Sequence, residues 1–72
     1  MNYLEWAEEY YENARRIFGV IEKRKAMLKN ASKDERKQLQ EDILKYRSIY
    51  YDLMRTAEHL AQRAEKESED AA

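Results

Sequence analysis

Apolar side chains recur in this chain in alternating steps of four and three residues, first before and then after a short polar break. This spacing, a seven-residue repeat, favours two helices packed as in a coiled coil. The first series, interrupted by Arg24, is Tyr3, Ala7, Tyr10, Ala14, Ile17, Ile21 and Leu28. The second series is Leu39, Ile43, Tyr46, Tyr50, Leu53, Ala57, Leu60 and Ala64. The pattern predicts a helix over 3–29, a turn at 30–32, a helix over 33–65 and a frayed tail over 66–72.

The break between the two series carries signals for a helix end and a helix start. Asn30 can adopt the left-handed conformation that ends a helix. Ser32 and Glu35 have the spacing of a capping box, which predicts that Ser32 caps the second helix. Folding the chain back here pairs Ile21 with Ile43, and Ala14 with Tyr50. We therefore expect an all-α, antiparallel two-helix hairpin.

The composition of the chain supports a helical fold and limits the size of the core that one chain can bury. The 72 residues include no proline, no cysteine and one glycine, Gly19, so turn-rich β folds, disulfides and thiolate metal sites are disfavoured. We expect one domain over 1–72, too small to bury a comfortable core without another subunit. No apolar run matches a membrane span or a signal peptide, so we expect a cytoplasmic protein with no membrane partner.

Two tyrosine doublets, at 10–11 and 50–51, indicate a second apolar surface. Adjacent helical residues are about 100° apart, so Tyr10 and Tyr50 can lie in the hairpin seam while Tyr11 and Tyr51 lie beside it. The residues predicted to form this second, intermolecular surface are Leu4, Trp6, Tyr11, Phe18, Val20, Met27, Leu44, Ile49 and Tyr51. So wide an apolar face favours homo-oligomerisation into a four-helix bundle or a larger helical assembly. Docking of a different protein on this surface is the competing interpretation.

No pattern in the chain indicates catalysis, a cofactor or a metal. Four acids near the N-terminus, Glu5, Glu8, Glu9 and Glu12, are better explained by the helix dipole and solubility than by a metal or acid–base site. His59 has no nucleophile or ligand constellation around it. We expect a protein that is not an enzyme and needs no cofactor.

Charge separates along the predicted rod. Residues 22–37 hold seven basic and three acidic side chains, whereas residues 1–14 hold four acidic and no basic ones. A basic tip or a groove between protomers, lined by tyrosine and arginine, would suit a nucleotide or nucleic acid. The possible anion contacts are Arg15, Arg47, Lys25, Lys29, Lys33 and Arg36. The alternative is that these charges are solvated and the rings are interface packing, which we favour.

The stretches "MNYLEWAEEYYENARRI" and "YYDLMRTAEHLAQRA" make the chain similar to small helical-hairpin proteins of unknown function from phages and mobile elements of Firmicutes. The resemblance implies an accessory protein that binds and inhibits a host protein, such as a defence factor. From the sequence we expect a protein-binding module of this kind. The alternatives are a nucleotide or nucleic-acid binder and a purely structural assembly module.

Overall fold

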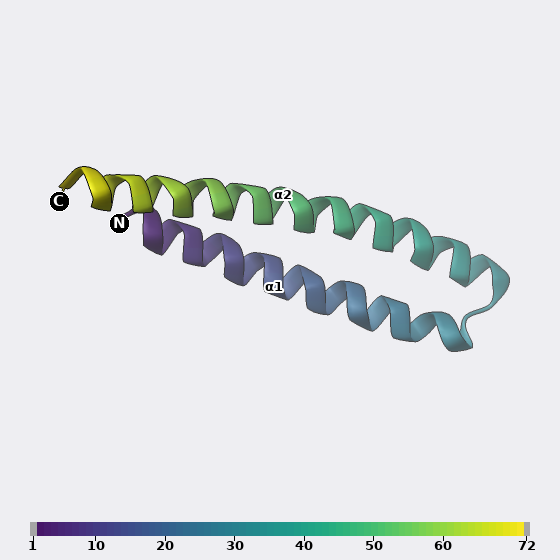
Figure 1. Cartoon of the computed structure of the whole chain (residues 1–72). Helices are drawn as coiled ribbons and strands as arrows, with labels where there is room; N and C mark the ends of the chain where they lie inside the picture. Colours follow the sequence, from purple (N-terminus) through teal and green to yellow (C-terminus); the bar gives the residue numbers. More distant parts are fainter. Residues whose placement is uncertain (1, 72) are drawn as a thin grey trace.

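The computed structural model describes residues 2–71 and folds back on itself once, as an antiparallel hairpin (Figure 1). Within this range, helix α1 spans Tyr3–Met27, a 3₁₀ turn η1 spans Leu28–Asn30, and helix α2 spans Lys33–Ala71. The molecule is a rod measuring 58 × 15 × 14 Å, with both termini at one end and the turn at the other (Figure 1). The predicted all-α hairpin is confirmed.

The start of each helix is capped by a side chain from the preceding residue. Asn2 Oδ1 accepts the backbone N–H of Glu5 at 2.8 Å. At the second helix, Ser32 Oγ accepts the N–H of Glu35 at 3.2 Å, as the S-x-x-E pattern predicts. Each bond satisfies one of the backbone donors that a helix leaves without a partner at its N-terminus.

The first helix ends differently from the prediction. No residue between 2 and 71 has a positive φ. The prediction that Asn30 adopts the left-handed conformation is therefore wrong. The chain instead tightens into η1, and the extended Ala31 (φ −82°, ψ 144°) donates its N–H to the carbonyl of Leu28 at 3.4 Å. A guanidinium nitrogen of Arg36, Nη2, donates to the same carbonyl at 3.2 Å. This carbonyl is thereby satisfied without a left-handed residue.

The second helix continues past Glu65 and includes residues 66–71 of the expected frayed tail. The segment "KESEDA" contains neither glycine nor proline, and its lysine, glutamates and alanine are strong helix formers. Propensity therefore extends the helix beyond its predicted end at Glu65. Ala72, the last residue of the expected tail, lies outside the described residues.

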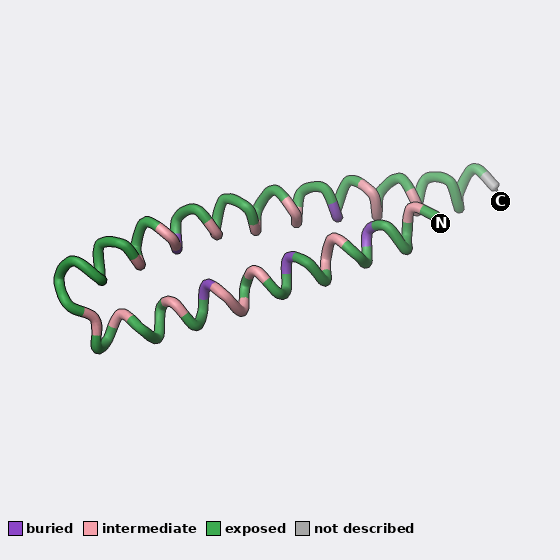
Figure 2. Tube along the Cα trace, turned by 180° about the vertical axis from the view of Figure 1, so that it is seen from behind, coloured by how far each residue is buried: buried purple, intermediate pink, exposed green. Residues whose placement is uncertain are grey.

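The core is a narrow seam between the two helices. The buried side chains of the described chain are Ala7, Ala14, Ile21, Ile43 and Ala57. All five occupy positions that the seven-residue repeat assigns to the seam. Buried and half-buried positions lie on the facing sides of the helices, and exposed positions lie on the outer sides (Figure 2). Three alanines and two isoleucines make a small core, and within residues 2–70 no large side chain is completely buried.

Candidate interaction surfaces

Large apolar side chains remain exposed on both flanks of the seam. Among residues 2–70 they are Leu4, Trp6, Phe18, Met27, Leu44, Ile49 and Tyr51, with 39–64% of their surface accessible. All seven belong to the set predicted from the sequence to form an intermolecular surface. The other two members, Tyr11 and Val20, are half-buried. The hairpin therefore leaves most of this predicted set uncovered.

These residues divide between two sides of the rod. On α1, Leu4, Tyr11 and Phe18 each directly follow a seam residue, and on α2 Leu44 and Tyr51 do the same. A residue after the seam turns to one side and a residue before it turns to the other. The first side, here called the Phe18 face, consists of Leu4, Tyr11, Phe18, Leu44, Tyr51 and Met54. The second, here called the Trp6 face, consists of Trp6, Val20, Met27 and Ile49.

The centre of the Phe18 face is an aromatic cluster that joins the two helices. The rings of Phe18 and Tyr50 lie 6.0 Å apart in a tilted arrangement. The rings of Tyr50 and Tyr51 meet edge to face at 5.6 Å. Such geometries are favourable between aromatic side chains. The second doublet therefore contributes one ring to the flank of the seam and one to the outer surface.

Two neighbouring open hollows share this cluster. One, of about 310 Å³, is lined by Tyr11, Arg15, Phe18, Tyr50 and Met54. The other, of about 220 Å³, is lined by Phe18, Ile21, Glu22, Lys25, Arg47, Tyr50 and Tyr51. Two tyrosines and two arginines, Tyr11, Arg15, Arg47 and Tyr51, thus line neighbouring hollows on one face of a single chain. Met54 was missed by sequence reasoning, although its spacing of four residues from Tyr50 places it on the same side of α2.

The predicted anion contacts do not form one site. Arg15, Lys25 and Arg47 line the hollows of the Phe18 face, and Lys25 Nζ is 3.5 Å from Glu22 Oε1. Lys29 and Lys33 are exposed at the turn. Arg36 is engaged with the Leu28 carbonyl that ends α1. The basic tip is therefore separate from the arginines that flank the aromatic cluster.

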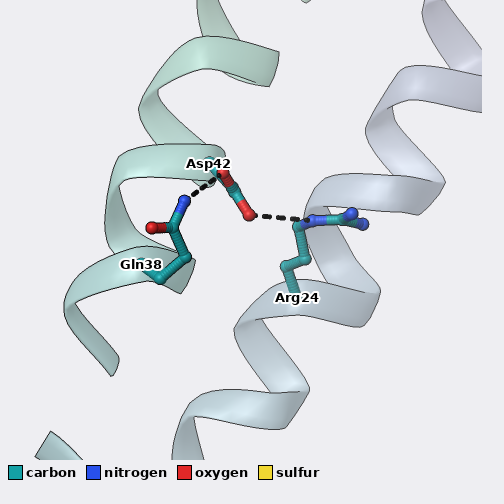
Figure 3. A network of polar contacts seen from close by, with 3 residues as sticks. All are labelled: Arg24, Gln38 and Asp42. Atoms are coloured by element: carbon teal, nitrogen blue, oxygen red, sulfur yellow. Dashed lines mark hydrogen bonds and ion pairs between the residues drawn. The ribbon is translucent and has the colours of Figure 1, made fainter. Parts of the chain in front are cut away.

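A polar network crosses the seam near the turn (Figure 3). Arg24 Nε is 3.9 Å from Asp42 Oδ2, and Gln38 Nε2 donates to Asp42 Oδ1 at 3.1 Å. The Arg24 guanidinium carbon also lies 4.9 Å from the centre of the Tyr46 ring. Arg24 can therefore occupy a seam position because its side chain reaches the edge of the seam. There its guanidinium lies near the Asp42 carboxylate and the Tyr46 ring.

The end that holds the termini has its own aromatic contacts. The Tyr3 and Trp6 rings are 6.4 Å apart, and the guanidinium carbon of Arg63 lies 5.8 Å from the centre of the Tyr3 ring. An open hollow beside them is lined by Asn2, Tyr3, Trp6 and Glu67. Glu67 belongs to the extension of α2 beyond Glu65, so part of this extension lies beside Trp6.

Polar chemistry in the described chain is sparse. Among residues 2–71, no group of three or more histidine, aspartate or glutamate side chains is placed to hold a metal ion. His59 is exposed and shares an open hollow with Gln62, Arg63 and Lys66. Neither helix, over the same residues, has an apolar stretch long enough to cross a membrane. The two apolar faces are surfaces on which another helix could pack, and cations lie beside aromatic rings on the Phe18 face and at one end of the Trp6 face.

Comparison with known proteins found no matching family model, no significantly similar curated protein and no significantly similar solved structure.

Proposed function

We propose that the protein is a non-enzymatic binding module that self-associates and presents an apolar helical surface to another protein. The observation that carries this proposal is the pair of exposed apolar faces on a hairpin whose core, within residues 2–70, holds only alanine and isoleucine. Contiguous apolar surface of this kind marks sites of protein interaction. A single antiparallel partner helix covers only one stripe of each helix, so the flanks remain available.

The large solvent-accessible area of the single hairpin supports the proposal that it binds a partner. The chain exposes 5907 Å², whereas a folded monomer of 8.7 kDa exposes about 4,700 Å². The excess, about 1,200 Å², is larger than the roughly 800 Å² that each subunit buries in an interface of standard size. A second hairpin packed on one face would produce a four-helix bundle, in which the aromatic cluster of the Phe18 face becomes part of a core.

Native mass spectrometry and sedimentation test self-association directly. We expect a mass that is a whole multiple of the 8.7 kDa chain. Phe18→Glu should reduce that mass to one chain, because association would bury an unpaired carboxylate in both copies. Ala26→Glu is the matched control: it adds the same charge to an exposed position of α1 outside both faces and should leave the assembly intact. A wild-type monomer throughout the accessible concentration range would contradict self-association.

The proposed partner is another protein. The resemblance to phage and mobile-element proteins described above suggests that this partner is a host protein, which the chain would bind and inhibit. The Trp6 face is the natural contact in this case, since Trp6 is 45% exposed and tryptophan is enriched among residues that dominate binding energy. Trp6→Ala should then abolish capture of the partner from a host lysate while leaving the self-associated mass unchanged. Loss of both together would mean that the two functions share one face.

A second candidate function is binding of a nucleotide or nucleic acid. The observation that favours it is the placement of Arg15, Lys25 and Arg47 around the hollows that contain Phe18 and Tyr50. Retention on a phosphate matrix that falls with salt would support it. Loss of retention in an Arg15→Gln/Arg47→Gln variant would locate binding at this face, and loss in Lys29→Glu/Lys33→Glu would locate it at the turn. Retention unaffected by both double variants would exclude the two sites.

A further inference from the structure

We infer that two copies of the chain pack antiparallel through the Phe18 face, with a twofold axis at the level of Tyr51. This inference rests on the self-association proposed above and adds the face, the direction and the residue pairing. It follows from two rows of side chains, one on each helix, and from the distribution of charge along the rod. In this dimer α1 lies against α1 of the second copy, and α2 lies against α2.

The end residues of the row on α2 carry opposite charges, which meet only when the two copies are antiparallel; Leu44 then lies opposite Glu58. At seven-residue steps it contains Lys37, Leu44, Tyr51, Glu58 and Glu65, all of them exposed in the hairpin. A twofold axis at Tyr51 places each tyrosine beside its copy and Lys37 of one chain opposite Glu65 of the other. Arg47, four residues before Tyr51, then lies within reach of Glu58 of the other chain. Basic residues precede the tyrosine and acidic residues follow it.

The row on α1 has a centre at the same level. At seven-residue steps it contains Leu4, Tyr11, Phe18 and Lys25. Its midpoint falls between residues 14 and 15, so an antiparallel copy brings Tyr11 of one chain opposite Phe18 of the other. The hollow lined by Tyr11, Arg15 and Phe18 from α1 and by Tyr50 and Met54 from α2 places this midpoint near the level of Tyr50 and Met54, the two residues that bracket Tyr51 in the chain. One axis therefore brings the aromatic residues of both rows close to their counterparts in the second copy.

The charge of the whole rod favours the same direction. The turn end carries the excess of basic side chains of residues 22–37, and the other end carries the acidic excess of residues 1–14 and 58–72. A parallel dimer would place like charges together at both ends of a rod 58 Å long, whereas an antiparallel dimer places opposite charges together. Arg15 is the exception on this face, because near the axis it lies opposite its own copy.

The deciding experiment is a charge-reversal cycle on Lys37 and Glu65. Both are exposed on α2, so their reversal leaves the hairpin seam intact. Because symmetry doubles each pair, we expect Lys37→Glu alone and Glu65→Lys alone each to raise the dimer Kd about tenfold. The double variant should recover wild-type affinity to within about threefold. Lys45→Glu is the control: the same change on α2, at an exposed position on the side of Ile49 and away from the Phe18 face, should leave the Kd unchanged.

The possible outcomes separate this inference from the proposed function. Recovery in the double variant supports the antiparallel pairing. A dimer in which the two reversals add, or in which Lys37→Glu tightens association, overturns the arrangement and leaves self-association standing. A wild-type monomer at all accessible concentrations overturns both. Sedimentation equilibrium over a dilution series measures each case.

A second measurement locates the axis without altering charge. The chain has no native cysteine, so single cysteines can be introduced cleanly. With the axis at Tyr51, two Leu44→Cys sites lie about 21 Å apart along the rod, too far for a disulfide, which needs Cα atoms within about 7 Å. Under mild oxidation Tyr51→Cys should form a covalent dimer rapidly, and Leu44→Cys should not. Equal rates, or faster linkage at Leu44→Cys, would overturn the placement of the axis.

Discussion

Ile43 and Leu44 are adjacent on α2 and nearly equal in size, but the fold gives them opposite surroundings. Ile43 is 7% exposed in the seam, whereas Leu44 is 64% exposed on the Phe18 face. Replacing each with alanine removes a side chain of the same volume from the intramolecular core in one case and from the proposed intermolecular surface in the other. The pair therefore tests which apolar contacts hold a single chain together and which act between chains.

The expected magnitudes differ in size and in concentration dependence. Ile43→Ala should lower the free energy of unfolding by about 2–4 kcal/mol, the usual cost of such a truncation in a core. That is a large part of the roughly 4–11 kcal/mol expected for a domain of this length. Leu44→Ala should cost less than about 1 kcal/mol at low protein concentration, since most of the side chain is already in water. At high concentration its cost should grow, because each dimer loses the contact twice.

Urea unfolding followed by far-UV circular dichroism, at low and at high protein concentration, measures both effects. The m-value should stay constant, so that midpoints report stability. Equal losses for the two variants at low concentration would refute the assignment of Ile43 to the seam and Leu44 to the surface. A loss for Leu44→Ala that does not change with concentration would refute its place in an intermolecular contact.

Three further tests, made with four substitutions, address the local structure, each by the midpoint of urea unfolding. Ser32→Ala should cost about 1 kcal/mol by removing the acceptor of the Glu35 N–H; no change would mean that solvent satisfies this donor equally well. Gly19→Ala should stabilise by about 0.5–1 kcal/mol, because an added Cβ meets no atom within 4 Å; destabilisation would show that another chain approaches there. In a double-mutant cycle, Arg24→Ala and Asp42→Ala should show a coupling energy below about 1 kcal/mol. Each side chain is 31% exposed, and the ion pair is long, at 3.9 Å. A larger coupling energy would indicate that water is excluded from this ion pair.

The hairpin was predictable because its determinants are periodic and local. The four–three spacing marks the seam, and all five buried side chains fall on it. The Ser32 cap also follows from sequence alone, since it depends on a side chain three residues from its donor. The end of α1 was not predictable in this way. It depends on Arg36, eight residues away, which reaches back to the Leu28 carbonyl only after the turn has formed.

The positions of the exposed residues were also predictable from the sequence, but the contacts between their side chains were not. Residues that flank a seam must lie on its two sides, so the exposure of Leu4, Phe18, Leu44 and Tyr51 follows from helix geometry and is observed. The details of the aromatic cluster depend on side-chain rotation. No spacing rule states that the Tyr50 ring turns toward Phe18 of the other helix or that the Arg24 guanidinium extends over Tyr46.

In the proposed dimer, the tyrosine doublets would link folding of one chain to association of two. In the second doublet Tyr50 flanks the seam and touches Tyr51 on the outer face at 5.6 Å, so a contact made by Tyr51 is transmitted directly to a residue that packs between the helices. Alanines at the seam allow the helices to approach closely but bury little apolar area. The larger side chains on the two faces would stabilise the fold only when a partner covers them. Any partner that binds the folded hairpin and not the unfolded chain adds its binding free energy to the stability of the fold. The stability of this protein should therefore depend on its own concentration, with the Phe18 face as the point of coupling.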